Sequence, residues 1–461
     1  MNLLLQHKLP LYAGMLFLTV CAMAFFVSTM SVLIIACAIA IGGYYYRAID
    51  QTELLLYPII IGIFLEAILA FLQAGNIPFT LFQVILIFSF VIFVIKKLIK
   101  KDLSVHVNYY TLPVLLFLSI IAFSLIYSAD RETGVFNLFR FTVLIVFVNF
   151  ITNFIESKST ILKGFVLATV ICLLLAVYSV FESILNPEIA INNLTSGGLV
   201  KGRSAAGGIY TDPNRFAASL FLPLAFGFSL VNSRINYKYR LGGLIIFFVI
   251  LGGIISTYSR SGFLGVALIC LLNIVYFNRV KPLVLVGALV IGTVLVIPDL
   301  RLALFSYTDR IFGLLTGGVD TSSSVRLMLG GAAIQMFFDS YLFGVGFDAF
   351  NEEFTRYYTT QQTITVTEPH NITYEILAEL GLHGFLVFGT LIWFLMKDGF
   401  NNIRDSFHVE DKIIAVTLFS SFCAYLLFYQ LYGGALYDTV WLLCIGLMLS
   451  HKKILNMDTD N

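Results

Sequence analysis

Charged side chains are scarce in this sequence. Asp, Glu, Lys and Arg make up 12% of the 461 residues, whereas a soluble domain carries about a quarter. Because 59% of the residues are hydrophobic and the mean hydropathy is +0.91, we predict a membrane protein. The formal net charge is only +1, so the basic surplus that nucleic-acid binding requires is missing, and a nucleic-acid partner is not expected.

Patterns that bind metals are missing as well. Neither a CxxC pair nor a His/Asp cluster with metal-ligand spacing occurs, and no pair of carboxylates resembles that of a glycosidase. We therefore expect no metal and no cofactor, and no disulfide framework. All six cysteines lie inside apolar runs, where they are expected to pack: Cys21, Cys37, Cys172, Cys270, Cys423 and Cys444.

Long apolar runs, in contrast, fill the chain. A helix that crosses a bilayer needs roughly 17–25 apolar residues, and about fourteen stretches qualify. The first has no small-residue cleavage site and is interpreted as a retained helix rather than a signal peptide. The predicted fold is all-α, a polytopic membrane helix bundle of about 12–14 spans. The stretches are 11–27, 30–46, 54–73, 79–95, 111–127, 135–154, 161–182, 214–231, 241–257, 261–277, 282–298, 371–396, 413–430 and 436–450.

Lys and Arg collect in alternate loops, which predicts the topology. Basic residues at 96–101, 234–240 and 452–453 mark the inner face if the N-terminus is inside. Two long segments, about 183–213 and 299–370, then lie outside. Every motif with a candidate function falls on the outer face under this one topology.

The first outer segment ends in "VKGRSAAGGIYTDPNR". Small residues around Arg203 allow a ligand to approach the backbone closely. Asp212 is a good cap, and the proline after it suits the first helical position, so a helix should begin beside Asn214 and Arg215 and offer its N–H groups to an anion. An ordinary helix start with an interfacial arginine is the alternative for Arg215.

Two further arginines stand at predicted helix starts. Arg260, in "STYSRSGFLG", lies at a short hairpin between two spans, where a charge is costly unless a ligand or partner meets it; snorkelling to lipid headgroups is the alternative. Arg326 follows serines suited to capping and opens a mostly apolar loop helix, which breaks at Gly344 and Gly346. Because this loop helix is so apolar, we expect it to lie at the membrane–water interface or to pack on the helix bundle.

His370 directly precedes the long apolar run of 371–396. A cap or structural role is the common one for a single histidine at a helix start, and that reading stays open. However, the preceding proline rigidifies the approach, Asn371 can cap the helix, and the imidazole lies on the same face as the arginines. Its unperturbed pKa, near 6.5, suits proton abstraction. Several arginines and one histidine on one face indicate an anionic, phosphate-bearing substrate whose tail lies in the bilayer.

The order of these motifs resembles the O-antigen ligase and O-antigen polymerase superfamily. The matching residues are Arg-Ser-x-x-Gly to Asp-Pro-Asn (203–214), Ser-Arg-Ser-Gly (259–262), Arg326 followed by Gly-Val-Gly (344–346), and His-Asn to Glu-Leu-Gly-Leu-x-Gly (370–384). The resemblance implies a metal-independent glycosyltransferase of the multi-membrane-helix (GT-C-like) type. It also implies that the enzyme lies in a bacterial inner membrane, with its site facing the periplasm or cell exterior.

The resemblance covers about residues 200–396 and implies three parts of the chain. Residues 1–200 would be N-terminal membrane helices, 201–396 the catalytic region with the external loop 299–370, and 397–461 the last membrane helices with a cytoplasmic tail. The sequence departs from the family's pattern where an aromatic residue commonly follows the loop arginine: Gly330 and Gly331 stand here. This leaves the register of the loop helix open.

The resemblance also implies roles for the singled-out residues. His370 would be the base, or would position the acceptor hydroxyl, and the arginines would hold the diphosphate of an undecaprenyl-diphosphate-linked glycan donor. The acceptor would be a glycan or lipid-linked sugar, and membrane lipids, a chain-length regulator and a flippase are further expected partners. The diphosphate-binding residues would be Arg203, Arg260, Arg326 and Arg215, supported by Asp212, Asn214, Asn371, Gly344 and Gly346.

Three functions remain open at this point. A polymerase of lipid-linked repeat units of a surface polysaccharide is favoured, and a ligase that moves the finished glycan to lipid A core or another acceptor uses the same chemistry. A flippase or transporter for lipid-linked sugars is the alternative of another class. It predicts ionisable residues in mid-helix and an internal repeat, whereas the charges of the motifs stand at predicted helix ends and no repeat is evident.

Overall fold

The computed structural model describes residues 41–69, 81–101, 109–185, 212–257, 259–280, 287, 321–358 and 369–459. Within these ranges the chain forms helices and turns and no strand, which confirms the predicted all-α membrane class. Residues 41–50 form a helix, followed by η1 (Thr52–Leu55), α3 (Leu56–Leu69), α4 (Leu81–Ile99), α5 (Thr111–Ser124), α6 (Arg131–Phe154), α7 (Lys158–Leu185), α9 (Pro213–Ser219), α10 (Phe221–Asn232), α11 (Tyr237–Ser256), α12 (Arg260–Phe277), α15 (Thr321–Ser340), α16 (Phe350–Tyr357), α17 (Ile372–Arg404), α18 (Val409–Tyr429), η3 (Ala435–Tyr437) and α19 (Thr439–Thr459).

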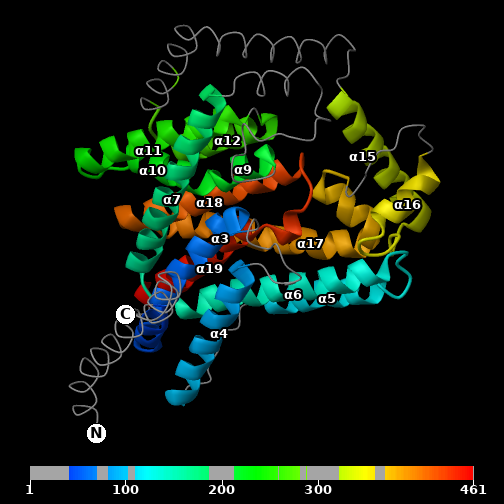
Figure 1. Cartoon of the computed structure of the whole chain (residues 1–461), viewed down its shortest axis with the longest axis horizontal. Helices are drawn as coiled ribbons and strands as arrows, with labels where there is room; N and C mark the ends of the chain where they lie inside the picture. Colours follow the sequence, from blue (N-terminus) through cyan, green and yellow to red (C-terminus); the bar gives the residue numbers. More distant parts are fainter. Residues whose placement is uncertain are drawn as a thin grey trace, which may run out of the picture.

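Nine helical segments of the described chain are long and apolar enough to cross a membrane, and α3 and α5 add two shorter apolar helices. Most of the described spans run side by side (Figure 1). The predicted spans 11–27, 30–46 and 282–298 lie wholly or mostly outside the described residues, as do Arg203 and the loop parts 299–320 and 359–368.

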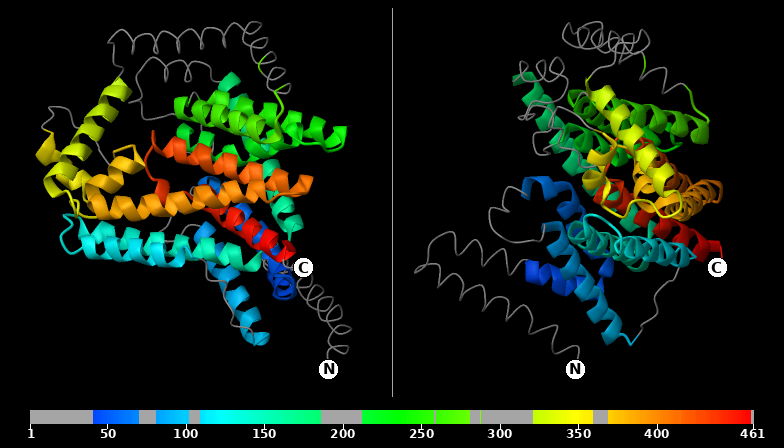
Figure 2. Two further views of the ribbon diagram at one scale, coloured as in Figure 1. Left: turned by 180° about the vertical axis from the view of Figure 1, so that it is seen from behind. Right: turned by 90° about the vertical axis from the view of Figure 1, so that its right-hand side faces the viewer.

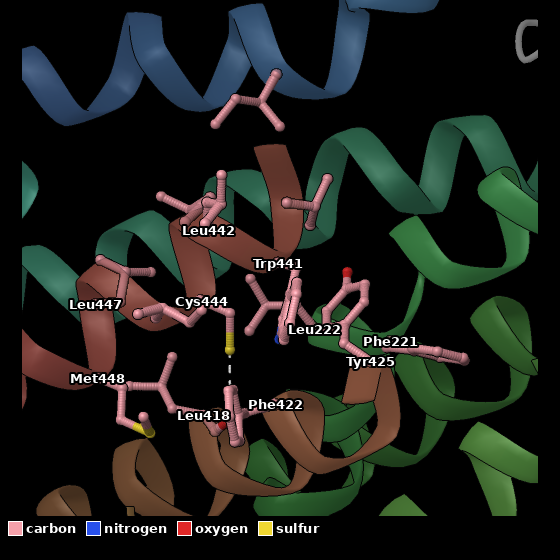
Figure 3. Packing of buried hydrophobic residues seen from close by; sticks show 14 of the residues in the cluster. Phe221, Leu222, Leu418, Phe422, Tyr425, Trp441, Leu442, Cys444, Leu447 and Met448 are labelled. Atoms are coloured by element: carbon pink, nitrogen blue, oxygen red, sulfur yellow. Dashed lines mark hydrogen bonds between the residues drawn. The ribbon is translucent and has the colours of Figure 1, made fainter. Parts of the chain in front are cut away.

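The centre of the bundle consists of α9–α10, α18 and α19. In the most apolar window of each of these spans 83% of the residues are buried, against 17–44% in the other six. Figure 3 shows how they meet: the Cys444 thiol of α19 donates to the Leu418 carbonyl of α18 at 3.3 Å, and Phe221 of α10 packs on Tyr425. A helix buried on all sides explains why these segments are apolar without an amphipathic period.

Helices α6, α7, α11, α12 and α17 pack around this centre, and α5 packs on α17 and α6. Glycines permit the closest of these contacts: a Cβ added at Gly243 of α11 would lie 2.6 Å from the Gly227 carbonyl oxygen of α10. Such small-residue contacts are a common basis of helix association in membranes. Outside the main group of spans, α15 packs along the first part of α17, and α16 follows it, as two views confirm (Figure 2).

One end of the bundle holds a closed ionic cluster. The Lys158 ammonium of α7 lies 3.0 Å from Asp411 of α18, whose carboxylate is 3.5 Å from His451 Nε2 of α19. Asp411 and His451 are fully buried. Nearby, Lys452 pairs with the buried Asp398. These basic residues belong to the turns that the sequence assigns to one face, so the candidate site lies at the other end of the bundle.

Candidate functional site

Four of the described helices that begin at this other end are capped by side chains near the candidate residues. Asp212 accepts from the Asn214 and Arg215 amides, Ser259 from Gly262, Asn371 from Tyr374 and Asp438 from Trp441. The predicted caps Asp212 and Asn371 are thus confirmed. Because the N-terminus of a helix carries a positive partial charge, several of them at one end favour an anion there.

Direct contacts tie these helix starts together. The Ser259 hydroxyl donates to Asn214 Oδ1 at 2.8 Å, which joins the start of α12 to that of α9. Arg260 is the first residue of α12 and Arg215 lies in the first turn of α9. The two arginines that the sequence separates by more than forty residues therefore stand at neighbouring helix starts. Arg215 also lies within electrostatic range of the carboxylates of Asp438 and Asp212.

His370 is held in an unusual backbone conformation. Its φ is +53°, a left-handed value that is costly for a residue with a side chain. Pro369 before it is buried and Asn371 after it caps α17. The ring is half-buried, 6.0 Å from the ring of Tyr432, and among the described residues its Nδ1 has no hydrogen-bond partner. Strain of this kind persists only where the surroundings impose it, and it is frequent at functional sites.

The surroundings lower the pKa of His370. Burial is the main cause, the positive charge of Arg326 acts in the same direction, and the Asp212 carboxylate opposes both. The imidazole is therefore neutral at neutral pH and can accept a proton. The same interactions show that Arg326 and Asp212 lie close enough to His370 for their charges to act on it.

Arg326 reaches this place because α15 packs closely on α17. A Cβ at Gly330 would lie 3.1 Å from the ring of Tyr374, in the first turn of α17, whereas a Cβ at Gly331 would meet nothing within 4 Å. The missing aromatic residue at these positions thus has a physical reason, because Gly330 makes room for Tyr374. The sequence left the register of this helix open. In the structure the helix brings Arg326 within electrostatic range of His370.

The loop from Gln430 to Asp438 connects the parts of the candidate site, and the sequence did not point to it. The backbone carbonyl of Gln430 accepts from the side-chain amide of Asn371 at 2.8 Å, and the Tyr432 hydroxyl donates to the Asp212 carboxylate at 2.7 Å. Asp438 accepts from the Tyr429 hydroxyl at 2.5 Å. The available signal was weak: "QLYGGALYD" holds two tyrosines, a glycine pair and an acid, but no basic residue.

A second polar group lies beside this loop. The Arg140 guanidinium of α6 lies 5.1 Å from the ring centre of Tyr437. Burial raises the pKa of Tyr437, and the carboxylates of Asp348, Glu375 and Glu379 raise it further. Glu375 and Glu379 belong to the motif at 370–384, but Arg140, Asp348 and Tyr437 were not singled out in the sequence, where they lie far apart. Their hydroxyl, carboxylate and guanidinium groups are of the kind that hydrogen-bond to sugar hydroxyls.

Gly344 and Gly346 lie in the segment after α15. This segment contacts α17 at Ala378 and Glu379, beyond the first turn of the helix that follows His370. The two glycines form a turn with φ of +72° and +108°, and the Val345 and Gly346 amides donate to the Ala378 and Glu379 carbonyls at 2.8 and 2.9 Å. These carbonyls are accessible because α17 is kinked at Gly381. The two glycines therefore support the site indirectly, since they anchor the segment after α15 to α17.

No group of three or more His, Cys, Asp and Glu side chains within the described ranges could hold a metal ion. The expected lack of a metal and of a cofactor stays a prediction. Arg203 lies outside the described residues, so the structure places Arg215, Arg260 and Arg326 with His370 but gives no position for Arg203. The roles of all these residues in binding and catalysis likewise stay predictions.

Comparison with known proteins supports the resemblance seen in the motifs. Residues 245–389 match the family described as O-antigen ligase, and this region contains Arg260, Arg326 and His370. The chain is also similar to the teichuronic acid biosynthesis protein TuaE of Bacillus subtilis (strain 168), with 27% identity over 298 residues. The alignment covers 59% of this chain and 58% of that protein, so the chain spans less than two thirds of its relative.

Proposed function

Because residues 245–389 match the O-antigen ligase family, we propose that the protein is a glycosyltransferase that polymerises undecaprenyl-diphosphate-linked repeat units of a surface polysaccharide. It would act on the outer face of a bacterial cell membrane. The observation that carries the proposal is the position of His370: a neutral, strained imidazole lies within electrostatic reach of Arg326, at the end of the bundle where Arg260 and Arg215 begin their helices.

In the proposed reaction His370 acts on the acceptor, and the arginines act on the diphosphate of the donor. His370 takes the proton from the acceptor hydroxyl, whose oxygen attacks the anomeric carbon of the donor sugar. The bond from that carbon to the diphosphate oxygen breaks, and the lipid diphosphate leaves with the electron pair. Arg260, Arg326 and Arg215, with Arg203, stabilise the negative charge that develops on it. A single displacement of this kind inverts the anomeric centre and requires no metal.

The helix starts add to this stabilisation. Partial positive charge at the starts of α9, α12, α17 and α19 is directed to the same end of the bundle. Asp212 and Asp438 cap two of these starts and neutralise part of the charge of Arg215. We therefore expect Arg260 and Arg326 to contribute more to diphosphate binding than Arg215.

The experiment is an assay with purified protein in detergent or vesicles, supplied with a lipid-linked repeat unit and no metal or nucleotide sugar. We expect lipid-linked dimers and longer chains. Product in the absence of a membrane gradient would exclude a flippase that only moves the lipid. A lack of product with a competent donor and acceptor would contradict the proposal.

A ligase is the second candidate, favoured by the name of the matched family. A deletion strain separates the two. Single repeat units attached to the final acceptor indicate a lost polymerase, whereas long chains that remain on the lipid carrier indicate a lost ligase. The chain-length regulator and the flippase expected as partners would then be sought by co-purification with the full-length protein.

A further inference from the structure

An apolar groove lies between α12, α17 and α18. Its volume is about 640 Å³, and its walls are apolar side chains from all three helices. Most of these side chains are partly buried and pack against the hydrophobic core behind them. The residues that matter for the argument are Leu272 of α12, Phe388, Gly389 and Ile392 of α17, and Phe419 and Leu427 of α18.

One end of this groove is polar and adjoins the candidate site. Thr373 and Gln430 line it there, and the Thr373 hydroxyl donates to Gln430 Oε1 at 2.9 Å. The Gln430 carbonyl accepts from the side chain of Asn371, the residue next to His370. From Gln430 the groove follows α18 to Phe419, eleven residues or roughly 16 Å at the helical rise. It therefore leads from His370 along the membrane-spanning part of the bundle.

Gly389 keeps the middle of the groove open. It lines the groove from α17, and a Cβ added there would meet no heavy atom within 4 Å. Gly389 is exposed, whereas most glycines of this bundle pack closely: at Gly399, further along the same helix, a Cβ would lie 2.3 Å from the ring of Phe419. Close helix packing therefore explains Gly399 but does not explain Gly389.

We propose that this groove binds the polyprenyl chain of the lipid-linked donor and that Gly389 sets the space for it; this inference rests on the proposed function. The occupant must be amphiphilic, because the groove is apolar along its length and joins a polar end beside His370 and Arg326. A diphosphate at that end places the attached chain at the mouth of the groove.

The groove distinguishes chains by shape rather than by hydrophobicity. Bilayer lipid is as apolar as the groove, so a chain that moves into it gains no hydrophobic free energy. What it gains is close packing of its branched methyl groups against Phe388, Ile392 and Leu272. Filling the groove should therefore weaken the productive binding of a long donor and leave a donor that cannot reach it unaffected.

The test compares two donors in the Gly389→Leu variant. One carries a full-length polyprenyl chain, and the other a chain cut to a few isoprene units with the same diphosphate and sugar. Because a leucine side chain would fill part of the groove, we expect kcat/KM for the long donor to fall about tenfold, mostly through KM, and for the short donor less than about twofold. The matched control is Gly242→Leu on α11, where a Cβ also meets nothing within 4 Å and which does not line the groove; it should change neither value.

Equal losses with both donors, or no loss with either, would overturn the proposal, because an ordinary bilayer lipid or another part of the protein would then occupy the groove. A second measurement does not depend on turnover. A donor with a photoreactive polyprenyl chain should cross-link to residues 385–396 of the wild-type protein, and a phosphatidylglycerol with the same photoreactive group should compete poorly. If the wild type forms no product but this cross-link is obtained, the proposed reaction fails and the groove stands; if product forms without the cross-link, the groove fails alone.

Discussion

Each end of the bundle holds a histidine, an aspartate and a basic residue, but in different arrangements. At one end His451, Asp411 and Lys158 form a closed cluster in which the Lys158 ammonium and the Asp411 carboxylate are in direct contact and the histidine is fully buried. At the other end His370, Asp212 and Arg326 influence one another through charge, and the ring of His370 is only half-buried. His370 Nδ1 lacks a hydrogen-bond partner among the described residues, as do both ring nitrogens of His451, so burial rather than hydrogen bonding separates the two histidines.

The backbone shows the same contrast. His451 lies inside the regular helix α19, whereas His370 has a positive φ just before α17 begins. In the Asp411 cluster the buried carboxylate lies beside the Lys158 ammonium, and the cluster joins α7, α18 and α19. The ring of His370, in contrast, is partly exposed and lies at an end of the bundle where several helices start. A histidine near an aspartate and a cation therefore does not identify a functional site by itself. Its burial and its backbone conformation separate a structural cluster from a candidate site.

The largest expected effect separates the two histidines directly. His370→Ala removes the proposed base and should reduce turnover about 10²–10⁴-fold, the usual contribution of general base catalysis. The protein should still insert and accumulate, because His370 packs at a loop and not in the core. Arg260→Ala should likewise abolish polymer formation. Turnover with the lipid-linked donor and the amount of protein in membranes are the measurements.

His451→Ala is the counterpart of this change. It should lower the thermal unfolding temperature and leave turnover per folded molecule close to the wild-type value. If His451→Ala abolished turnover in a stable protein, the closed cluster would belong to the catalytic apparatus and the contrast between the two ends would fail.

A smaller effect is expected on stability when the closed cluster loses its cation. Lys158→Met leaves the buried Asp411 with His451 only, and removing one partner of a buried ion pair typically costs about 3–5 kcal/mol. Lys158 is a quarter exposed, so we expect the lower end of that range. Thermal unfolding in detergent is the measurement.

Two controls sharpen this comparison. The double variant Lys158→Met, Asp411→Leu should recover most of the loss, because no unpaired charge remains buried. Arg404→Met removes an ion pair with Asp405 in which both side chains are well exposed, and it should leave the unfolding temperature nearly unchanged. A large effect of Arg404→Met, or none of Lys158→Met, would contradict the assignment of the buried cluster as a structural tie.

The glycine turn that anchors α15 should show a moderate effect. In Gly344→Ala the new Cβ would lie 2.4 Å from the Glu379 carbonyl, at a φ of +72°. We expect a loss of about 1–3 kcal/mol in the docking of this segment, measured as faster proteolysis between α15 and α16. Gly331→Ala is the matched control, since it adds a methyl group in open space within a helix and should stabilise α15 by up to about 1 kcal/mol. Equal behaviour of the two variants would show that the turn does not hold α15.

The smallest effect is a shift in pH dependence. His370 must be neutral to accept a proton, so turnover falls in acid as the ring becomes protonated. Burial lowers the pKa of His370 first, and Arg326 lowers it further. Arg326→Gln removes that positive charge, so the pKa should rise and the acid limb of the profile should move to higher pH.

Asp212→Asn should have the opposite effect on this profile. It removes the charge that raises the pKa of His370 but keeps the helix cap, because asparagine caps as well as aspartate. The acid limb should then move to lower pH. The measurement is kcat/KM against pH for both variants, because this profile reports the pKa of the free protein. Shifts of the same sign would show that another group titrates.

Sequence reasoning predicted what depends on local pattern. Apolar length gave the spans, and the capping residues Asp212 and Asn371 marked helix starts where the structure has them. The motif order gave the superfamily that the comparisons support. Arg260 and His370 could be placed at helix starts because few polar residues interrupt the apolar runs.

What the sequence could not supply depends on packing between distant helices. The loop from Gln430 to Asp438 contacts Asn371 and Asp212 only because α18 lies between α17 and the α9–α10 pair. Gly381 resembles any glycine inside an apolar helix, yet it kinks α17 and exposes carbonyls for the segment after α15. Arg140 of the second polar group likewise meets Tyr437 only through the packing of distant segments.

The loop from Gln430 to Asp438 also determines when the candidate site can assemble during synthesis. Its residues follow α18 in the chain, so a nascent protein that has inserted α9, α12 and α17 has made Asp212, Arg260 and His370 but not the tyrosine that bridges Asp212 and packs near His370. Helices of a membrane protein enter in sequence order, and contacts between distant segments form after both are present. If the proposed site is correct, a chain stopped before residue 430 would reach the membrane without the contacts that complete it.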